Sequence, residues 1–168
     1  MSTSPQANIT FKAALKRPLC FLGLGFGSGL LPKAPGTYGT LVAIPMVWLM
    51  MQFSLPIYLG ITAIAFMAGI WICQQTAEWL GRPDPGAVVW DEIVGLMVTM
   101  IAAPAGWKWM VLGFVLFRFF DIFKPWPISL ADRAIHGGLG IMVDDVLAGF
   151  YAFVCIQWLW RVAPTIVW

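Results

Sequence analysis

Charge is scarce in this sequence of 168 residues, and its scarcity excludes some classes of partner. Ten Lys or Arg and eight Asp or Glu make up 11% of the chain, and the formal net charge is only +2. No long basic run is present, so a nucleic-acid partner is not expected. The few charges that do occur therefore need an individual explanation.

Cysteine is rare as well. The three cysteines, Cys20, Cys73 and Cys155, are scattered and odd in number, so they indicate neither a disulfide framework nor a CxxC zinc site. The sequence also lacks the GxxxxGK[ST] and GxGxxG patterns for phosphate binding and the DxDx(T/V) pattern of aspartyl-phosphatases. Any phosphate chemistry must therefore depend on other residues.

Apolar residues, in contrast, are abundant. They make up 60% of the chain, ten tryptophans are present and the mean hydropathy is +0.82, which lies outside the usual composition of soluble proteins. The length is that of one domain. The composition predicts an all-α polytopic membrane bundle with about four to five membrane-embedded helices, forming a single domain over residues 1–168.

The N-terminus does not resemble a signal peptide. Residues 1–17 form a polar, mildly basic lead-in, but the apolar stretch that follows is broken by glycines and prolines. No small-residue cleavage site follows a clean hydrophobic core. We expect the N-terminus to be retained and to lie in the cytoplasm.

Glycine and proline divide the apolar sequence into helices. Because glycine costs about 1 kcal/mol and proline about 3 kcal/mol inside a helix, segment 23–40 is predicted to be a loop or a broken helix. Segment 124–143 is predicted to be a glycine-bearing connection. Several helical segments are near or below the roughly 20 residues that span hydrocarbon. The predicted helices are 39–53, 57–76, 91–100, 107–123 and 144–161.

Alternating crossings would bring the rare charges to one membrane face. With the N-terminus inside and one crossing per helix, the connections before the first, third and fifth helices lie on the cytoplasmic side, in agreement with the positive-inside tendency. Ionisable groups at membrane depth cost several kcal/mol unless they are paired, hydrated or metal-bound, which makes them site candidates. The residues predicted to converge are Lys33, Asp91, Glu92, Arg118, Asp121, Lys124, His136, Asp144 and Asp145.

Two adjacent acid pairs suggest a metal site. Asp91–Glu92 and Asp144–Asp145 both stand at predicted helix starts, where the helix dipole by itself favours carboxylates. The preference for acids at helix starts does not explain why two such pairs and Asp121 are expected on the same side of a membrane. Mg²⁺ prefers oxygen ligands and often shares its coordination shell with a phosphate. We therefore expect these five carboxylates to hold Mg²⁺, directly or through water.

Basic residues near the acids suit phosphate binding. Arg118 precedes Asp121 by three residues and so shares its helix face, where a simple ion pair is the alternative. For Arg133, contact with lipid headgroups is the alternative. The loop residues expected to hold phosphate oxygens are Lys33, Lys124 and Arg133.

The single histidine and the glycine-rich segment complete the predicted site. His136, followed by Gly137 and Gly138, is expected either to make a structural hydrogen bond or to serve in phosphate binding or proton transfer to the leaving oxygen. The backbone N–H groups of segment 23–40 could cradle an anion.

Five motifs stand out over roughly residues 21–150. They are Gly25-Phe-Gly-Ser-Gly-Leu30, Pro35-Gly-Thr37, Val89-Trp-Asp-Glu92, Phe117-Arg-Phe-Phe-Asp-Ile-Phe-Lys-Pro-Trp-Pro-Ile128 and His136-Gly-Gly-Leu-Gly-Ile-Met-Val-Asp-Asp145, the last followed by Ala148-Gly149. Their combination is specific, and it resembles that of the phosphatidylglycerophosphatase A family, bacterial membrane phosphatases of phosphatidylglycerol synthesis.

The resemblance implies an all-α fold and Mg²⁺-dependent removal of the terminal phosphate from phosphatidylglycerophosphate, giving phosphatidylglycerol and inorganic phosphate. The reaction would take place at the cytoplasmic leaflet of the bacterial inner membrane. The expected partners are this lipid and the bilayer, with no protein partner inferred. Expected catalytic residues are Asp91, Glu92 (the preferred general base), Asp144 and His136, and expected substrate contacts are Ser28, Lys33, Thr37, Arg118, Lys124 and Arg133.

Several alternatives stay open at this stage. A covalent aspartyl-phosphate competes with direct attack by water, and related lipid phosphates such as phosphatidic acid could be lesser substrates. The main alternative function is a small cation transporter, because acids within a membrane also line ion pathways. A transporter would not need the Lys, Arg and His groups that surround the acids.

Overall fold

The computed structural model describes residues 11–162, so residues 1–10 of the predicted lead-in lie outside the described part. Every regular element between residues 11 and 162 is helical, as predicted. The elements are α1 (Phe11–Leu15), α2 (Pro18–Gly23), the 3₁₀ helix η1 (Gly25–Leu30), α3 (Pro35–Met50), α4 (Leu55–Leu80), α5 (Trp90–Thr99), α6 (Trp107–Phe123), α7 (Ile128–Ala134) and α8 (Gly137–Val162).

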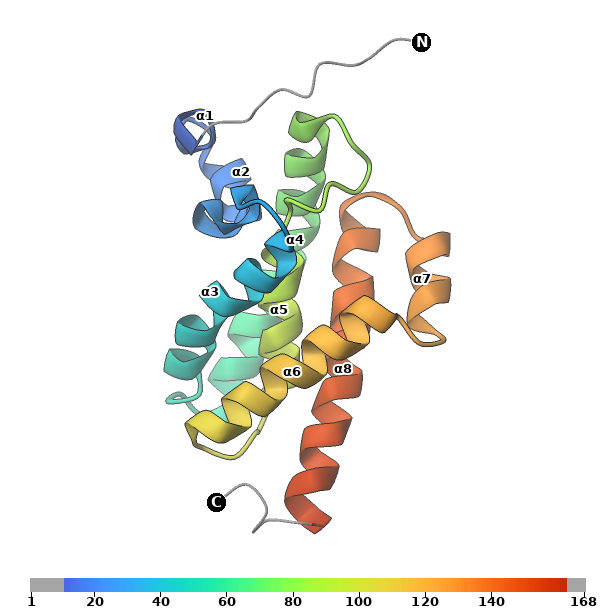
Figure 1. The fold of residues 1–168 in the computed structure, drawn as a ribbon. Coiled ribbons are helices and arrows are strands. Elements are labelled where there is room, and N and C mark those ends of the chain that lie inside the picture. Colours follow the sequence, from blue (N-terminus) through green and yellow to red (C-terminus); the bar gives the residue numbers. More distant parts are fainter. Residues whose placement is uncertain (1–10, 163–168) are drawn as a thin grey trace.

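The short helix α5 lies at the centre of the bundle. In Figure 1 it lies between α3 and α8, with α6 crossing in front. Residues 92–97 of α5 are all buried, and Ile93 and Leu96 have no exposed surface. Because α5 contacts four longer helices, it carries its first-turn residues into the interior of the protein.

Glycines let α5 and α8 approach closely. A Cβ atom added to Gly149 of α8 would collide with the carbonyl oxygen of Gly95 in α5, and one added to Gly95 would collide with the ring of Phe117. Across the same contact, the Thr99 hydroxyl of α5 lies 3.4 Å from the Gly149 carbonyl oxygen of α8, while it also donates to the Gly95 carbonyl oxygen within α5 at 2.9 Å. The spacing of these two helices therefore depends on hydrogen atoms at positions 95 and 149.

Alanine at Gly149 is expected to lower stability despite its better helix propensity. The propensity gain is about 1 kcal/mol, but a collision with backbone forces two core helices apart, and overpacking costs about 1–3 kcal/mol. Thermal unfolding in detergent should show a lower midpoint for Gly149→Ala. Gly60→Ala is the control, because nothing lies within 4 Å of its added Cβ. An unchanged midpoint for Gly149→Ala would contradict the close approach.

The helices alternate in direction, so their ends gather at two poles. In Figure 1 the last turn of α4 lies at the top, and the first turns of α3, α5 and α8 and the last turn of α6 lie below it, toward the middle of the bundle. We call this side of the bundle the pole of the acidic residues. The turns from α3 to α4 and from α5 to α6 lie at the other. The connections that carry most of the charged residues therefore lie on the same side of the bundle, and their predicted place at one membrane face stays a prediction.

Two helices, α4 and α8, are long and apolar enough to cross a membrane by length and composition; each has 26 residues. The other long helices, α3 and α6, have 16 and 17 residues. At about 1.5 Å per residue they reach about 25 Å, short of a hydrocarbon core of about 30 Å. Of the four to five membrane-embedded helices predicted, the fold thus offers two candidate spans.

The last helix begins earlier than predicted. Segment 124–143 is not a simple connection, because it contains α7 and the first quarter of α8. The backbone N–H of Gly138 donates to Gln74 Oε1 at 2.7 Å, and a Cβ at Gly138 would collide with the carbonyl oxygen of Ile70. Tight packing against α4 therefore favours glycine here and outweighs its poor helix propensity.

Because α8 begins earlier than predicted, the second acid pair has a different position within its helix. Asp144 and Asp145 lie about two turns inside α8, given 3.6 residues per turn. The prediction that they stand at a helix start is wrong for this pair. It is right for Asp91 and Glu92, which lie in the first turn of α5.

The glycine-rich segment is the predicted broken helix. Within η1, Phe26 and Gly27 have positive φ values of 58° and 95°, which interrupt the helical backbone. Helix α3 then begins at Pro35, four residues before the predicted start at 39. Proline suits this first turn because its missing N–H would have no partner there. Pro45 lies inside α3.

Candidate active site

Three carboxylates from two helices converge in the interior. Asp91 and Glu92 come from the first turn of α5, and Asp145 comes from α8. One oxygen of each lies within 4.8 Å of the others. Glu92 is 9% exposed and Asp145 is 3% exposed. We call these three residues the acid cluster.

The acid cluster lacks the hydrogen-bond donors that buried carboxylates require. Asp91 Oδ1, Glu92 Oε2 and Asp145 Oδ2 are each buried without a partner among the described residues, as is Asp144 Oδ1 nearby. Leaving a buried charged group unsatisfied costs several kcal/mol. A hard divalent cation with oxygen ligands removes this cost. The donor set and its unpartnered atoms therefore fit Mg²⁺.

Arg118 of α6 lies against this cluster. Its Nη1 is 2.6 Å from Asp121 Oδ2 and 3.7 Å from Glu92 Oε1. The ion pair along α6, which was the alternative to a phosphate contact of Arg118, is therefore present, and the same guanidinium lies beside Glu92 of the acid cluster. Arg118 Nε is buried without an acceptor. Unpartnered donors beside unpartnered acceptors suit a phosphate, because a phosphoryl group and a cation together satisfy both.

Lys124 connects α6 to α7 and α8 at the edge of the site through two ion pairs. It caps α6 in a left-handed conformation, and its Nζ contacts Asp132 Oδ1 of α7 at 2.7 Å and Asp144 Oδ2 of α8 at 2.6 Å. Burial lowers the pKa of Lys124, but hydrogen bonds to the two carboxylates more than offset this and raise the pKa above its ordinary value. Lys124 is therefore charged throughout the neutral pH range.

The start of α3 closes one side of the acid cluster. A Cβ added to Gly36 would collide with Glu92 Oε1 and would lie 3.0 Å from Arg118 Nη1. Thr37 follows within the same helical turn and is partly buried, whereas Lys33, just before the helix, is exposed with a φ of 65°. The structure thus brings this end of the glycine-rich segment to the acids, as predicted.

Ser28 has a local role in the structure. Its hydroxyl is buried and donates to the carbonyl oxygen of Gly25 at 2.8 Å. This bond stabilises the broken helix η1, in which Gly25 has a positive φ of 53°. A substrate contact of Ser28 stays a prediction.

His136 and Arg133 lie farther out. Both are exposed, Arg133 on α7 and His136 just before α8. His136 and Asp144 line a cavity of about 150 Å³ that is also bordered by Asp84 and Asp132. His136 therefore lies beside the site. It lines a cavity together with Asp144, the residue that directly precedes Asp145 of the acid cluster.

Sequence reasoning missed three residues of this region. Gly36 was part of a motif but had no assigned contact with Glu92, and its role follows only from the packing of α3 against α5. Asp132 and Asp84 were not singled out. Asp132 lies eight residues after Lys124, and this spacing alone does not indicate a contact. The two side chains meet because of where α7 lies relative to the end of α6.

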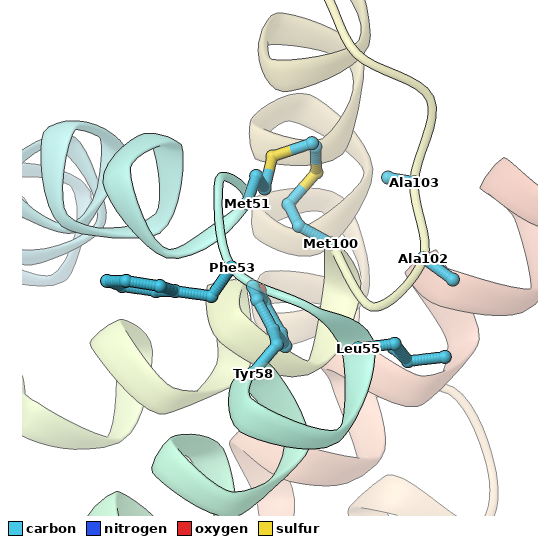
Figure 2. Close-up of a pocket in the computed structure, with 7 residues that line it drawn as sticks. All are labelled: Met51, Phe53, Leu55, Tyr58, Met100, Ala102 and Ala103. Carbon is cyan, nitrogen blue, oxygen red and sulfur yellow. The ribbon is translucent and has the colours of Figure 1, made fainter.

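A second cavity lies at the opposite pole and is apolar. It measures about 100 Å³ and is formed by the two turns there; in Figure 2 the side chains of Met51 and Met100 lie close together near the ring of Tyr58. The Tyr58 hydroxyl is already used, donating to the Met97 carbonyl oxygen at 2.7 Å. The lining residues carry no charge, so this cavity offers neither carboxylates for a metal nor cations for a phosphate. They are Met51, Phe53, Leu55, Tyr58, Met100, Ala102 and Ala103.

Comparison with known proteins identifies the family. The family described as phosphatidylglycerophosphatase A matches residues 21–160, which include the acid cluster, Arg118 and Lys124. The chain belongs to the phosphatidylglycerophosphatase A family. Membership makes it an enzyme that hydrolyses a phosphate monoester. The match confirms the resemblance found in the motifs.

Relatives of this family cover most of the chain. Phosphatidylglycerophosphatase A of Escherichia coli is 43% identical over 152 residues, 89% of this chain and 88% of its own length. The protein of the same name from Haemophilus influenzae is 44% identical over 147 residues, with coverage of 86% and 90%. A putative phosphatidylinositol-3-phosphatase of Bacteroides thetaiotaomicron is 40% identical over 154 residues, with coverage of 84% and 95%. No solved structure was found to match the chain.

Proposed function

We propose that this protein removes the terminal phosphate of phosphatidylglycerophosphate in a Mg²⁺-dependent reaction, releasing phosphatidylglycerol and inorganic phosphate. The observation that carries the proposal is the acid cluster, whose unpartnered oxygens lie beside the guanidinium of Arg118. The lipid is taken from the names of the two relatives from Escherichia coli and Haemophilus influenzae, whose lengths the chain largely covers. A cation transporter is not favoured, because the relatives are phosphatases.

The metal would be held by the acid cluster, with Asp121 and Asp144 beside it. When bound, Mg²⁺ supplies positive charge to the phosphoryl oxygens and activates water for attack on phosphorus. The fit rests on the unpartnered carboxylate oxygens in the interior. The ion also explains why carboxylates from two helices are tolerated so close together.

Protein groups would perform the remaining steps. Arg118 has a free buried N–H and would donate it to a phosphoryl oxygen as charge redistributes in the transition state. Glu92 is the preferred general base, because one of its oxygens faces Arg118 and the other is unpartnered. His136, at the adjacent cavity, would give a proton to the leaving oxygen. Lys124 adds positive charge and fixes the position of Asp144.

The acid cluster recognises a phosphoryl group but does not specify the rest of the lipid. The relative from Bacteroides thetaiotaomicron bears the name of a putative phosphatidylinositol-3-phosphatase at 40% identity. A phosphoinositide 3-phosphate is therefore the second candidate substrate, and it belongs in the same assay. Phosphatidic acid is the third.

We further propose a multi-pass protein of the bacterial cytoplasmic membrane. Helices α4 and α8 would cross the bilayer, with the shorter helices embedded beside them. The pole with the acid cluster would face the cytoplasm, where the positive-inside tendency places Arg82, Lys124 and Arg133. Large exposed apolar side chains, including Ile64, Met67 and Trp71 of α4, would contact lipid.

The decisive experiment is phosphate release by the purified protein in detergent. Phosphatidylglycerophosphate, phosphatidylinositol 3-phosphate and phosphatidic acid are each supplied with Mg²⁺ or with EDTA. We expect release with Mg²⁺, fastest from phosphatidylglycerophosphate, and none with EDTA. Release that persists in EDTA would remove the metal from the mechanism. Faster release from the phosphoinositide would transfer the assignment to the second candidate.

A further inference from the structure

The cavity beside Asp144 is a second polar feature of this pole, separate from the acid cluster. It is bordered by the loop after α4, by α7 and by the start of α8, and measures about 150 Å³. Since a water molecule in the liquid occupies about 30 Å³, this volume corresponds to about five water molecules. Its size suits a small organic group.

The charged groups of the lining are carboxylates. Asp84, Asp132 and Asp144 border the cavity together with His136. Ionised carboxylates only accept hydrogen bonds, so a ligand must offer donors. These acceptor oxygens suit a hydroxyl group, which can donate a hydrogen bond, better than a phosphate dianion, which cannot.

The carboxylates of the cavity are separate from the converging oxygens of the acid cluster. Among the described residues, the acids whose oxygens converge within 4.8 Å are Asp91, Glu92 and Asp145, and those around the cavity do not join them. Asp132 Oδ1 and Asp144 Oδ2 are neutralised by Lys124. Asp84 forms no ion pair among the described residues, so its carboxylate is left to accept a hydrogen bond from a ligand.

The position of the cavity relates it to the reaction. Asp144 lines the cavity and directly precedes Asp145 of the acid cluster, so the cavity and the cluster adjoin the same turn of α8. Pro83, Ile135 and Ile141 also line the cavity and suit carbon atoms. Carboxylates together with apolar side chains match a short polyol.

We propose that this cavity binds the hydroxyl-bearing leaving group of the substrate, a short polyol attached to the scissile phosphate, and that Asp84 is a specificity-determining residue that accepts a hydrogen bond from its hydroxyl. The proposal rests on the proposed function, in which the leaving group is a glyceryl unit. It assigns the acid cluster to the phosphoryl group and the cavity to the group that departs.

The test compares two lipids that differ by one hydroxyl. The first is phosphatidylglycerophosphate, and the second is its analogue with propanediol in place of the headgroup glycerol. The wild-type enzyme is expected to show kcat/KM at least about tenfold higher for the first, the effect of one hydrogen bond to a charged group. Asp84→Asn should reduce that preference to less than about threefold while leaving kcat/KM for the analogue unchanged.

Controls separate this proposal from the proposed function. Glu78→Gln changes an acid on α4 that bonds Gln74 and Gln75 and does not line the cavity, so it should keep the wild-type preference. Equal kcat/KM for the two lipids in the wild type, or an equal loss on both in Asp84→Asn, would overturn the polyol site and leave the phosphatase intact. No phosphate release from either lipid would instead remove the proposed function.

Discussion

Asp145→Asn is expected to abolish phosphate release while leaving the protein folded. The substitution keeps the size of the side chain but removes one of the three charges of the acid cluster, on which the proposed metal depends. Losing several kcal/mol of charge stabilisation in the transition state corresponds to a loss of about a thousandfold in turnover. The measurement is phosphate release from phosphatidylglycerophosphate at saturating Mg²⁺.

Thermal unfolding in detergent distinguishes this from a structural defect. Without Mg²⁺ the variant should be at least as stable as the wild type, because an uncompensated buried charge has been removed. With Mg²⁺ the wild type should gain stability, by about 2.7 kcal/mol at a concentration 100 times Kd, and the variant should gain little. A variant that loses stability without Mg²⁺ and keeps its response to the ion would contradict the proposed metal site.

Gly36→Ala is expected to inactivate the enzyme by a different route, through a single methyl group. The added Cβ would collide with Glu92 Oε1, the end of a side chain that can move, and not with backbone. Glu92 would then be displaced from Arg118 and from the acid cluster. Because displacement by about 1 Å can cost about a hundredfold in rate, we expect a loss of this size in kcat.

The stability of this variant should change little. Alanine improves the helix propensity at position 36 by about 1 kcal/mol, and the moved carboxylate offsets part of that gain. Gly60→Ala in α4 makes the same chemical change where nothing lies within 4 Å, so it should keep full activity. If Gly36→Ala retained wild-type kcat, the contact between α3 and Glu92 would have no part in catalysis.

These two substitutions concern a site built where several helix ends meet. Asp91 and Glu92 depend on where α5 begins, and Asp145 depends on the close crossing of α5 and α8 at Gly95 and Gly149. The site is therefore sensitive to backbone spacing as well as to the charged residues themselves. Gly149→Ala should accordingly reduce activity along with stability, because it separates α8 from α5.

Sequence patterns alone predict an all-helical chain and the side of the bundle on which its charged residues lie. An apolar composition interrupted by glycine and proline predicted helices close to α4, α5 and α6, because these breakers act locally on the backbone. Charges are so few that their places between alternating helices already predicted convergence at one end. The motifs then indicated the family, which the comparison with relatives confirmed.

The pairing of individual charged residues, in contrast, follows from the packing of the folded helices. From sequence, five acids formed one undivided metal set, but packing pairs Asp121 with Arg118 and Asp144 with Lys124. Asp91, Glu92 and Asp145 remain as the cluster with converging oxygens. These pairings depend on helix crossings and side-chain directions between residues far apart in the chain, which local sequence patterns do not encode.

The start of α8 shows the same limit. Glycines at 137, 138 and 140 predicted a connection, because isolated glycine disfavours helix. In the folded protein, contact with α4 at Ile70 leaves no room for a side chain at Gly138, so the same glycines permit the helix. Local propensity is worth about 1 kcal/mol per glycine, and close packing of two long helices outweighs it.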